Sequence, residues 1–201
     1  MFDALIIGGG AAGMQCALVL GSANSKEYSK NKNIGIIIHQ KGSDLQSALF
    51  NNVLGIAAGT TGKEILENGK KQLSNLYPHI VQIDNEKVFS IDGDAGNFSV
   101  KTNKEIYKAK LVVVALGYSK FFDIKGLNEF VKPHPKAQTI KERIWLVNKD
   151  YLIKEGIYVA GTLAGGRSQF AIAAGSGAQV ATDILTLWNN GIHTKVHDKI
   201  V

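Results

Sequence analysis

The sequence predicts a three-layer α/β fold built on a doubly wound parallel sheet, with a small antiparallel β excursion. The first observation is a set of apolar, strand-length segments rich in β-branched residues, at 2–7, 34–39, 111–115 and 157–160. Such segments are typical of parallel strands that are covered on both faces. The second is a set of segments with helical spacing of apolar residues, at 11–23, 61–77 and 168–188. The third is that most of the 22 glycines gather at 8–13, 55–62 and 161–177, which indicates backbone that turns tightly or approaches another group closely.

The first elements follow one another closely. The strand at 2–7 ends at three consecutive glycines, and the small and apolar residues of 11–23 suit a helix that packs closely on a sheet. A polar, lysine-rich loop at 24–33 then leads to the strand at 34–39.

After the helix at 61–77 the pattern changes to short strands joined by tight turns, at 80–83, 87–91, 98–102 and 105–107. We interpret these strands as a small antiparallel meander over about residues 78–108. The stretch 118–142 is the least regular part of the chain, and a short strand is expected after it at 143–147. The residues 191–201 are expected to form a polar tail or a docking arm.

Length and charge limit the classes of protein. A chain of 201 residues fits one α/β domain, so we expect a single domain over 1–201. The net charge of +6 comes from scattered lysines, without an arginine-rich stripe and interleaved aromatic residues, so we expect no nucleic-acid partner. A solvated basic surface is the favoured interpretation, and attraction for an acidic partner or a phosphate-bearing ligand is the alternative.

Cysteine and histidine usage excludes several chemistries. Cys16 is the only cysteine, which rules out a disulfide within the chain, a CxxC pair and a multi-cysteine metal site. Its apolar neighbours predict a buried, inert thiol. His134 lies between two prolines and is expected to be exposed, and His193 and His197 are expected to lie in a solvated tail rather than to bind a metal. We therefore expect no metal site.

The uncharged run 4–23 has the length of a membrane span. The glycines at 8, 9, 10 and 13 disfavour one continuous helix, and no basic segment precedes the run as it would in a signal peptide. We therefore expect no membrane association and a cytoplasmic location.

The segment Gly8-Gly9-Gly10-Ala11-Ala12-Gly13 has the pattern G-x-G-x-x-G between a predicted strand and a predicted helix. In this context Gly8 allows the tight turn, Gly10 lets the backbone approach a pyrophosphate, and Gly13 lets the helix pack on the strand. The pyrophosphate would lie on the helix N-terminus, near free N–H groups and the positive end of the helix dipole. The pattern predicts a Rossmann-like dinucleotide site.

The fingerprint normally continues with a carboxylate at the end of the second strand, which binds the ribose hydroxyls. Here that strand ends with His39 and Gln40. Either Gln40 or His39 supplies this hydrogen bond, or the ribose is held from elsewhere.

Two further segments are expected to face the same ligand. A buried strand closes at Ala115 and Gly117, and another ends at Gly161 before a helix that includes Gln169 and Phe170. The N–H groups at the start of that helix can stabilise a negative charge, such as that of a reduced flavin.

These three segments, in this order, resemble the FAD domain of thioredoxin reductase-like flavoproteins, within the pyridine nucleotide-disulfide oxidoreductases. The segment 51–55 is similar to the one that sets an asparagine against the flavin, which would be Asn52, and 61–66 resembles the helix start after it. The resemblance covers nearly the whole chain. It implies a non-covalent FAD and an oxidoreductase or electron-transfer activity.

The departures from the family are specific. Where the family carries an NAD(P)H domain of on the order of 100 residues, this chain has only residues 118–142, without a second glycine fingerprint and without the redox CxxC of that domain. The family's Gly-Asp before the last helix is Gly161-Thr162, so the aspartate that binds the ribityl chain is replaced by a hydroxyl. Arg167 lies in the loop that enters this helix, where it would face the cofactor.

Three functional interpretations stay open, and no catalytic residue is assigned. The chain is an oxidoreductase that meets NAD(P)H or a small substrate at an exposed flavin, an electron-transfer module served by a redox partner protein, or a non-enzymatic binder of FAD or NAD(P) that acts with a partner. A homodimer is left open. By itself the chain is not expected to be a disulfide reductase.

Overall fold

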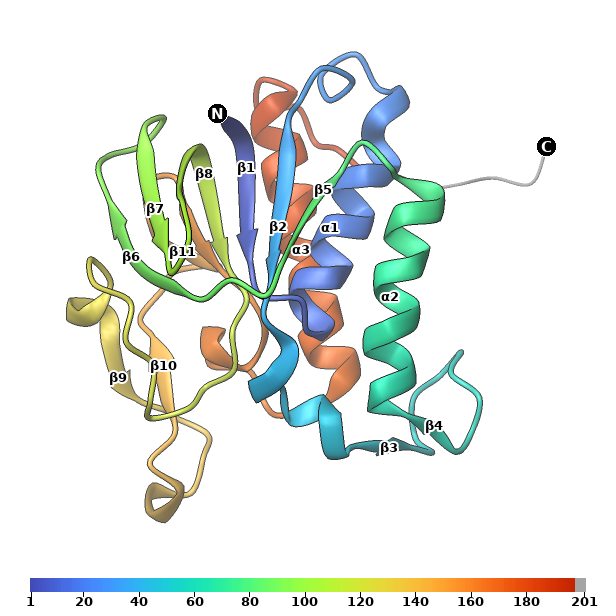
Figure 1. The fold of residues 1–201 in the computed structure, drawn as a ribbon, viewed down its shortest axis with the longest axis vertical. Coiled ribbons are helices and arrows are strands. Elements are labelled where there is room, and N and C mark those ends of the chain that lie inside the picture. The colour runs from blue at the N-terminus through green and yellow to red at the C-terminus, as the bar shows by residue number, and fades with distance from the viewer. Residues whose placement is uncertain (198–201) are drawn as a thin grey trace.

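The computed structural model describes residues 1–197. Its main sheet has the strand order β11-β12-β8-β1-β2-β5 (Figure 1). The strands are β11 (Leu152–Lys154), β12 (Ile157–Val159), β8 (Ile106–Val114), β1 (Phe2–Ile7), β2 (Ile34–Ile38) and β5 (Val81–Asp84). From β12 to β5 all neighbours pair in parallel, and β11 adds an antiparallel edge strand. The mostly parallel Rossmann-like sheet that the sequence predicts is confirmed.

The α-helices of the described residues cover one face of this sheet: α1 (Ala11–Ser22), α2 (Gly62–Leu76) and α3 (Phe170–Trp188) (Figure 1). Side chains of β1, β2 and β8 that point to this face form one core cluster with α1, α2 and α3, including Cys16, Leu73 and Ile184. The helix at 61–77 begins with a capping box, because the Thr61 hydroxyl accepts from the Glu64 N–H at 3.3 Å and the Glu64 carboxylate accepts from the Thr61 N–H at 2.7 Å.

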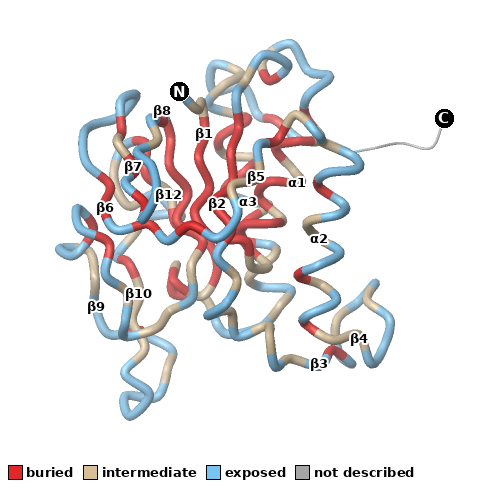
Figure 2. The backbone as a smooth tube through the Cα atoms, viewed as in Figure 1, coloured by how far each residue is buried: buried red, intermediate tan, exposed pale blue. Residues whose placement is uncertain are grey.

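The opposite face of the sheet carries β structure in place of helices. The strands β6 (Val88–Asp92) and β7 (Phe98–Thr102) pair antiparallel, and β7 continues the ladder onto the first half of β8. Phe98, Leu127 and Leu146 pack there against the inner strands in a second core cluster. Figure 2 shows the sheet as the most buried layer between these two coverings.

Two details of the predicted meander are wrong. The strand at 80–83 does not belong to it, since β5 pairs in parallel with β2 at the edge of the main sheet. The strands expected at 105–107 and 111–115 are one continuous strand, β8, which pairs with β7 over its first half and with β1 over its second. The first error concerns a pairing between distant segments, which local patterns do not specify. The second is a break expected at residues 108–110, where β8 continues with alternating exposed and buried residues.

The stretch 118–142 contains two 3-10 helices (Asn128–Phe130 and Thr139–Lys141) and the strand β9 (Val131–Pro133), which pairs antiparallel with β10 (Ile144–Leu146). A second small ladder joins β3 (Leu49–Phe50) to β4 (Thr60–Thr61). After α3 the chain continues to residue 197 without regular structure, and the rest of the expected tail, 198–201, lies outside the described residues.

Among the described residues, α3 alone is long and apolar enough to cross a membrane by composition. Core helices of globular proteins meet the same criterion, and Val180, Ala181, Ile184 and Leu185 of α3 are buried in the core shared with α1. The uncharged run 4–23 is divided into a strand, a glycine loop and a helix.

Candidate functional site

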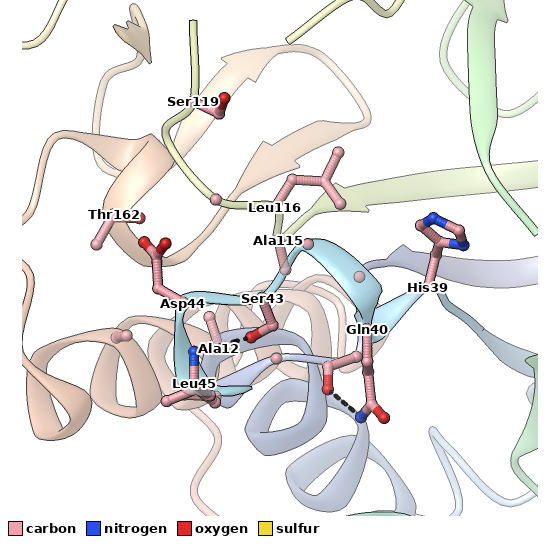
Figure 3. Close-up of a pocket in the computed structure, with 18 of the residues that line it drawn as sticks. Ala12, His39, Gln40, Ser43, Asp44, Leu45, Ala115, Leu116, Ser119 and Thr162 are labelled. Carbon is pink, nitrogen blue, oxygen red and sulfur yellow. Dashed lines mark hydrogen bonds between the residues drawn. The ribbon is translucent and has the colours of Figure 1, made fainter. Parts of the chain in front are cut away.

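A cleft of about 540 Å³ opens where the fingerprint loop, the loops after β2 and β8, and the start of α3 meet (Figure 3). This is the edge of the sheet at which the parallel strands β1, β2, β8 and β12 end. Ligands of open α/β sheets bind in the crevice outside the carboxyl ends of the strands, and ligand sites are commonly about 300–1,000 Å³ in volume. The cleft therefore has the place and the size of a cofactor site.

The three glycines of the fingerprint have different surroundings. Gly8 has a φ of +116°, and a Cβ built on it would overlap the carbonyl group of Ala115. A Cβ on Gly13 would overlap the carbonyl oxygen of Gly8, so Gly13 holds α1 close to the strand. A Cβ on Gly10 would meet only the Ser43 hydroxyl, at 4.0 Å. Gly10 is thus the position where bare backbone faces open cleft.

Two helix N-termini face this space without side-chain caps. The N-cap residues are Gly10 for α1 and Gln169 for α3, and neither helix has an acidic residue in its first turn. The helices approach closely, since a Cβ on Gly177 of α3 would overlap the carbonyl oxygen of Ala12. Uncapped N–H groups and two converging positive dipole ends favour a ligand with negative charge.

The turn after β12 forms another wall of the cleft. Gly161 has a φ of +80°, and its N–H donates to the Ser176 hydroxyl at 2.7 Å, which fastens the turn to α3. Thr162 follows it and lines the cleft. Gly117, after β8, also lines the cleft, with no atom near enough to obstruct a Cβ.

The two residues expected to replace the missing carboxylate lie at the cleft in different ways. His39 is exposed and lines it. Gln40 also lines it, but its Nε2 donates to the carbonyl oxygen of Gly9 at 2.8 Å. Gln40 therefore braces the fingerprint loop through its Nε2 group.

Most of the predicted site residues line the cleft, namely Gly8, Gly9, Gly10, Ala11, Ala12, His39, Gln40, Ala115, Gly117, Gly161, Thr162, Gln169 and Phe170. Three predicted residues lie outside the lining. Gly13 is a packing position, and Asn52 and Arg167 are exposed. The roles of all these residues toward a cofactor stay predictions.

Several residues of the lining were missed by the sequence analysis. Ser43 and Asp44 start a short 3-10 helix (Asp44–Ser47 with Ser43 as its cap), and Asp44 is exposed in the cleft without an ion pair among residues 1–197. In Figure 3 its carboxylate points toward the side on which Thr162 lies. The sequence signal for Asp44 was an acidic residue six positions after the end of β2 (Ile38), whereas the fingerprint has its carboxylate directly at that end.

Glu86, Lys87 and Val88 also line the cleft. Glu86 is a buried carboxylate that accepts from the Thr102 hydroxyl at 2.6 Å and from the Tyr107 hydroxyl at 3.0 Å. Burial, together with the hydrogen bond to Glu86, raises the pKa of Tyr107 to about 12. These contacts tie the loop before β6 to the antiparallel layer.

The chain matches the family model of the pyridine nucleotide-disulphide oxidoreductases over residues 2–161. It belongs to this family. Members of the family and its reductase relatives bind FAD, which is the cofactor that the three motifs predict. The open backbone at Gly10, the two uncapped helix N-termini and the size of the cleft fit this group.

Among the relatives within the family, the chain is 30% identical over 127 residues to a ferredoxin–NADP reductase of Streptococcus pyogenes serotype M28. The match covers 60% of this chain and 36% of that protein, so the chain spans about a third of the length of the curated relatives it matches. Similar solved structures include a ferredoxin-flavin thioredoxin reductase from Clostridium acetobutylicum, with a TM-score of 0.68 and 18% identity over 94% of this chain and 98% of that one. Another is a thioredoxin reductase from Gloeobacter violaceus, with a TM-score of 0.69 and 14% identity over 100% of this chain and 98% of that one. At this identity the structures establish the shared fold.

Proposed function

We propose that the protein is a single-domain FAD-dependent electron-transfer protein of the cytoplasm, whose cleft at the ends of β1 and β8 holds FAD without a covalent bond. The observation that carries the proposal is the bare backbone of Gly10, which faces open cleft between the uncapped N-termini of α1 and α3. When bound, FAD supplies the electron-transfer chemistry, and the protein supplies binding, orientation and electrostatics.

The residues of the cleft divide the binding between them. The N–H groups at Gly10, Ala11 and Ala12 receive the pyrophosphate at the start of α1. Those at Gln169 and Phe170, at the start of α3, favour negative charge on the other part of the cofactor. Asp44 and Thr162 offer acceptors to its hydroxyl groups, and Glu86–Val88 contribute a further part of the lining.

The features of this chain support electron transfer with a redox partner protein better than they support a thiol–disulfide reaction. Cys16 is fully buried among apolar residues, and this burial raises the pKa of its thiol far above the usual range. A protonated, inaccessible thiol cannot exchange with a disulfide. The net charge of +6 favours an acidic partner, and relatives of this chain act with ferredoxin or thioredoxin by name.

A second candidate function is an oxidoreductase that takes its electrons directly from NAD(P)H. The observation that favours it is the exposed Phe121, 80% accessible at the edge of the cleft, in the segment that stands where the family carries its NAD(P)H domain. An exposed aromatic ring at that place offers a stacking surface for a planar ligand.

Anaerobic mixing of the FAD-loaded protein with NADPH distinguishes these functions. The proposal predicts slow or undetectable bleaching of the flavin band, because the sequence has no second glycine fingerprint with which to position the nicotinamide. Reduction by an acidic electron carrier such as reduced ferredoxin is expected to be faster. Rapid and saturable bleaching by NADPH would favour the second candidate.

A further inference from the structure

His134 is the residue that departs most from its expected surroundings. It was expected in an exposed loop between two prolines, but it is 7% exposed. Both of its ring nitrogens are engaged: Nδ1 accepts from the N–H of Lys136 at 3.1 Å, and Nε2 lies 3.1 Å from the carbonyl oxygen of Thr162. Since a carbonyl oxygen only accepts and a backbone N–H only donates, these contacts select the neutral ring with its proton on Nε2.

The partners of His134 belong to two different walls of the cleft. Thr162 lies in the turn after β12 and lines the cleft. Tyr118 directly follows the lining residue Gly117, and its ring meets the His134 ring edge to face, with 5.4 Å between centroids and 75° between planes. One buried side chain therefore contacts both loops from outside the cleft.

The backbone around His134 is itself held in place. The His134 N–H donates to the Arg143 carbonyl oxygen at 2.9 Å, next to the β9–β10 ladder. The Arg143 guanidinium lies over the Tyr118 ring, 4.6 Å from its centroid. The segment 118–147 thus fixes the ring of His134. The contact of this ring with the Thr162 carbonyl then holds Thr162 in place.

We propose that His134 is a positioning residue for the cofactor, which sets the Gly161-Thr162 turn and the loop at Gly117-Tyr118 relative to each other through its bond to the Thr162 carbonyl. Thr162 stands where the family has the aspartate that contacts FAD, and a hydroxyl is a weaker acceptor than a carboxylate. His134 fixes the placement of this weaker acceptor through its contact with the Thr162 carbonyl. This inference rests on the proposed function, since it assigns a role within the same site.

Three variants separate positioning from packing. His134→Phe keeps a planar ring beside Tyr118 and removes both hydrogen bonds, whereas His134→Gln retains an N–H donor and an oxygen acceptor. His79→Phe is the matched control, because His79 also meets a tyrosine ring edge to face, Tyr77 at 6.2 Å, but lies outside the cleft. Folding is checked by circular dichroism and thermal unfolding of each protein without FAD.

FAD titration, the visible spectrum and the flavin midpoint potential are measured for each folded variant. His134→Phe is expected to bind FAD about tenfold more weakly, the usual effect of one lost hydrogen bond, with a changed flavin band and a shifted potential. His134→Gln is expected to recover most of the affinity, and His79→Phe to match the native protein. Native affinity, spectrum and potential in a folded His134→Phe would overturn the inference, as would equal losses in all three variants.

If His134→Phe does not fold, nitrogen NMR of the native protein with labelled histidine tests the inference instead. The expected result is a neutral His134 ring protonated on Nε2, with both ring-nitrogen shifts changed by FAD. The other tautomer, or shifts that FAD leaves unchanged, would overturn the inference. Failure of the proposed function is distinguishable, because the native protein would then take up no FAD at all.

Discussion

Gln40 Nε2 donates a hydrogen bond of 2.8 Å to the carbonyl oxygen of Gly9, so the segment after β2 braces the fingerprint loop from the side. At this position the dinucleotide fingerprint normally has a carboxylate, which binds the ribose. A carboxylate could not donate to the Gly9 carbonyl. With Gln40 at the place of this carboxylate, a contact with the ligand is replaced by a contact that holds the fingerprint loop.

Gln40→Leu is predicted to weaken FAD binding by several-fold to about tenfold, because the variant leaves the Gly9 carbonyl without its donor. Equilibrium titration with FAD measures this change. Gln46 is the control, since its Nε2 contacts only the Gln40 carbonyl, at 3.3 Å, and Gln46→Leu is expected to have a smaller effect. A larger loss in Gln46→Leu than in Gln40→Leu would contradict the bracing role.

Gly10→Val is predicted to abolish FAD binding in a folded protein. Apart from Ser43 at 4.0 Å, nothing stands near the position of the new Cβ, so the side chain is accommodated by the fold but fills the space that the pyrophosphate needs. Circular dichroism and FAD titration give the two measurements. Gly175→Val, in α3 with open space around its Cβ and outside the cleft, is the control and is expected to bind FAD normally. Normal FAD affinity in folded Gly10→Val would exclude the assigned role.

Asp44→Asn is predicted to weaken FAD binding by about tenfold, since the neutral amide is a poorer acceptor for the cofactor's hydroxyl groups than the carboxylate is. The measurement is the same titration, with Asp94→Asn as a control at an exposed site outside the cleft. Unchanged or improved affinity in Asp44→Asn would show that Asp44 only borders the site.

Tyr107 is predicted to contribute to the pH dependence of the free energy of unfolding. Its pKa is raised from 10.0 to about 12, first by burial and then by Glu86, so the folded state holds the proton more tightly than the unfolded state. The resulting stabilisation is fully present below pH 10 and is lost as the pH rises toward about 12. Urea unfolding of the native protein and Tyr107→Phe across this range tests it. The native protein should lose more stability than Tyr107→Phe, and parallel losses would contradict the prediction.

Local patterns predicted the elements that depend on local chemistry. The glycines of the fingerprint, the buried strands β1, β2 and β12 and the helix start at Thr61 are each encoded within a few residues, and the expected helices and strands lie there. Non-local pairing was not predictable in this way. The strand at 80–83 has the same character whether it pairs with β2 or with β6, and only the folded chain makes the choice.

The residues of the candidate site likewise divide into those that local motifs predict and those that depend on contacts between distant segments. Positions given by the motifs, such as Gly10 and Thr162, lie at the cleft. Asp44 reaches the cleft from a short 3-10 helix and Glu86 from a loop, and neither segment has a recognisable sequence pattern. The contact of His134 with the carbonyl group of Thr162, in the turn after β12, joins residues that are 28 positions apart in the chain. Contacts of this kind depend on how distant loops meet.

The absorption spectrum of the purified protein, followed by titration of the colourless form with FAD, tests the central claim most directly. The account predicts flavin bands in the purified protein, or uptake of one FAD per chain with these bands appearing, and loss of this uptake in Gly10→Val. A folded, colourless protein that binds NAD but takes up no FAD would contradict the account.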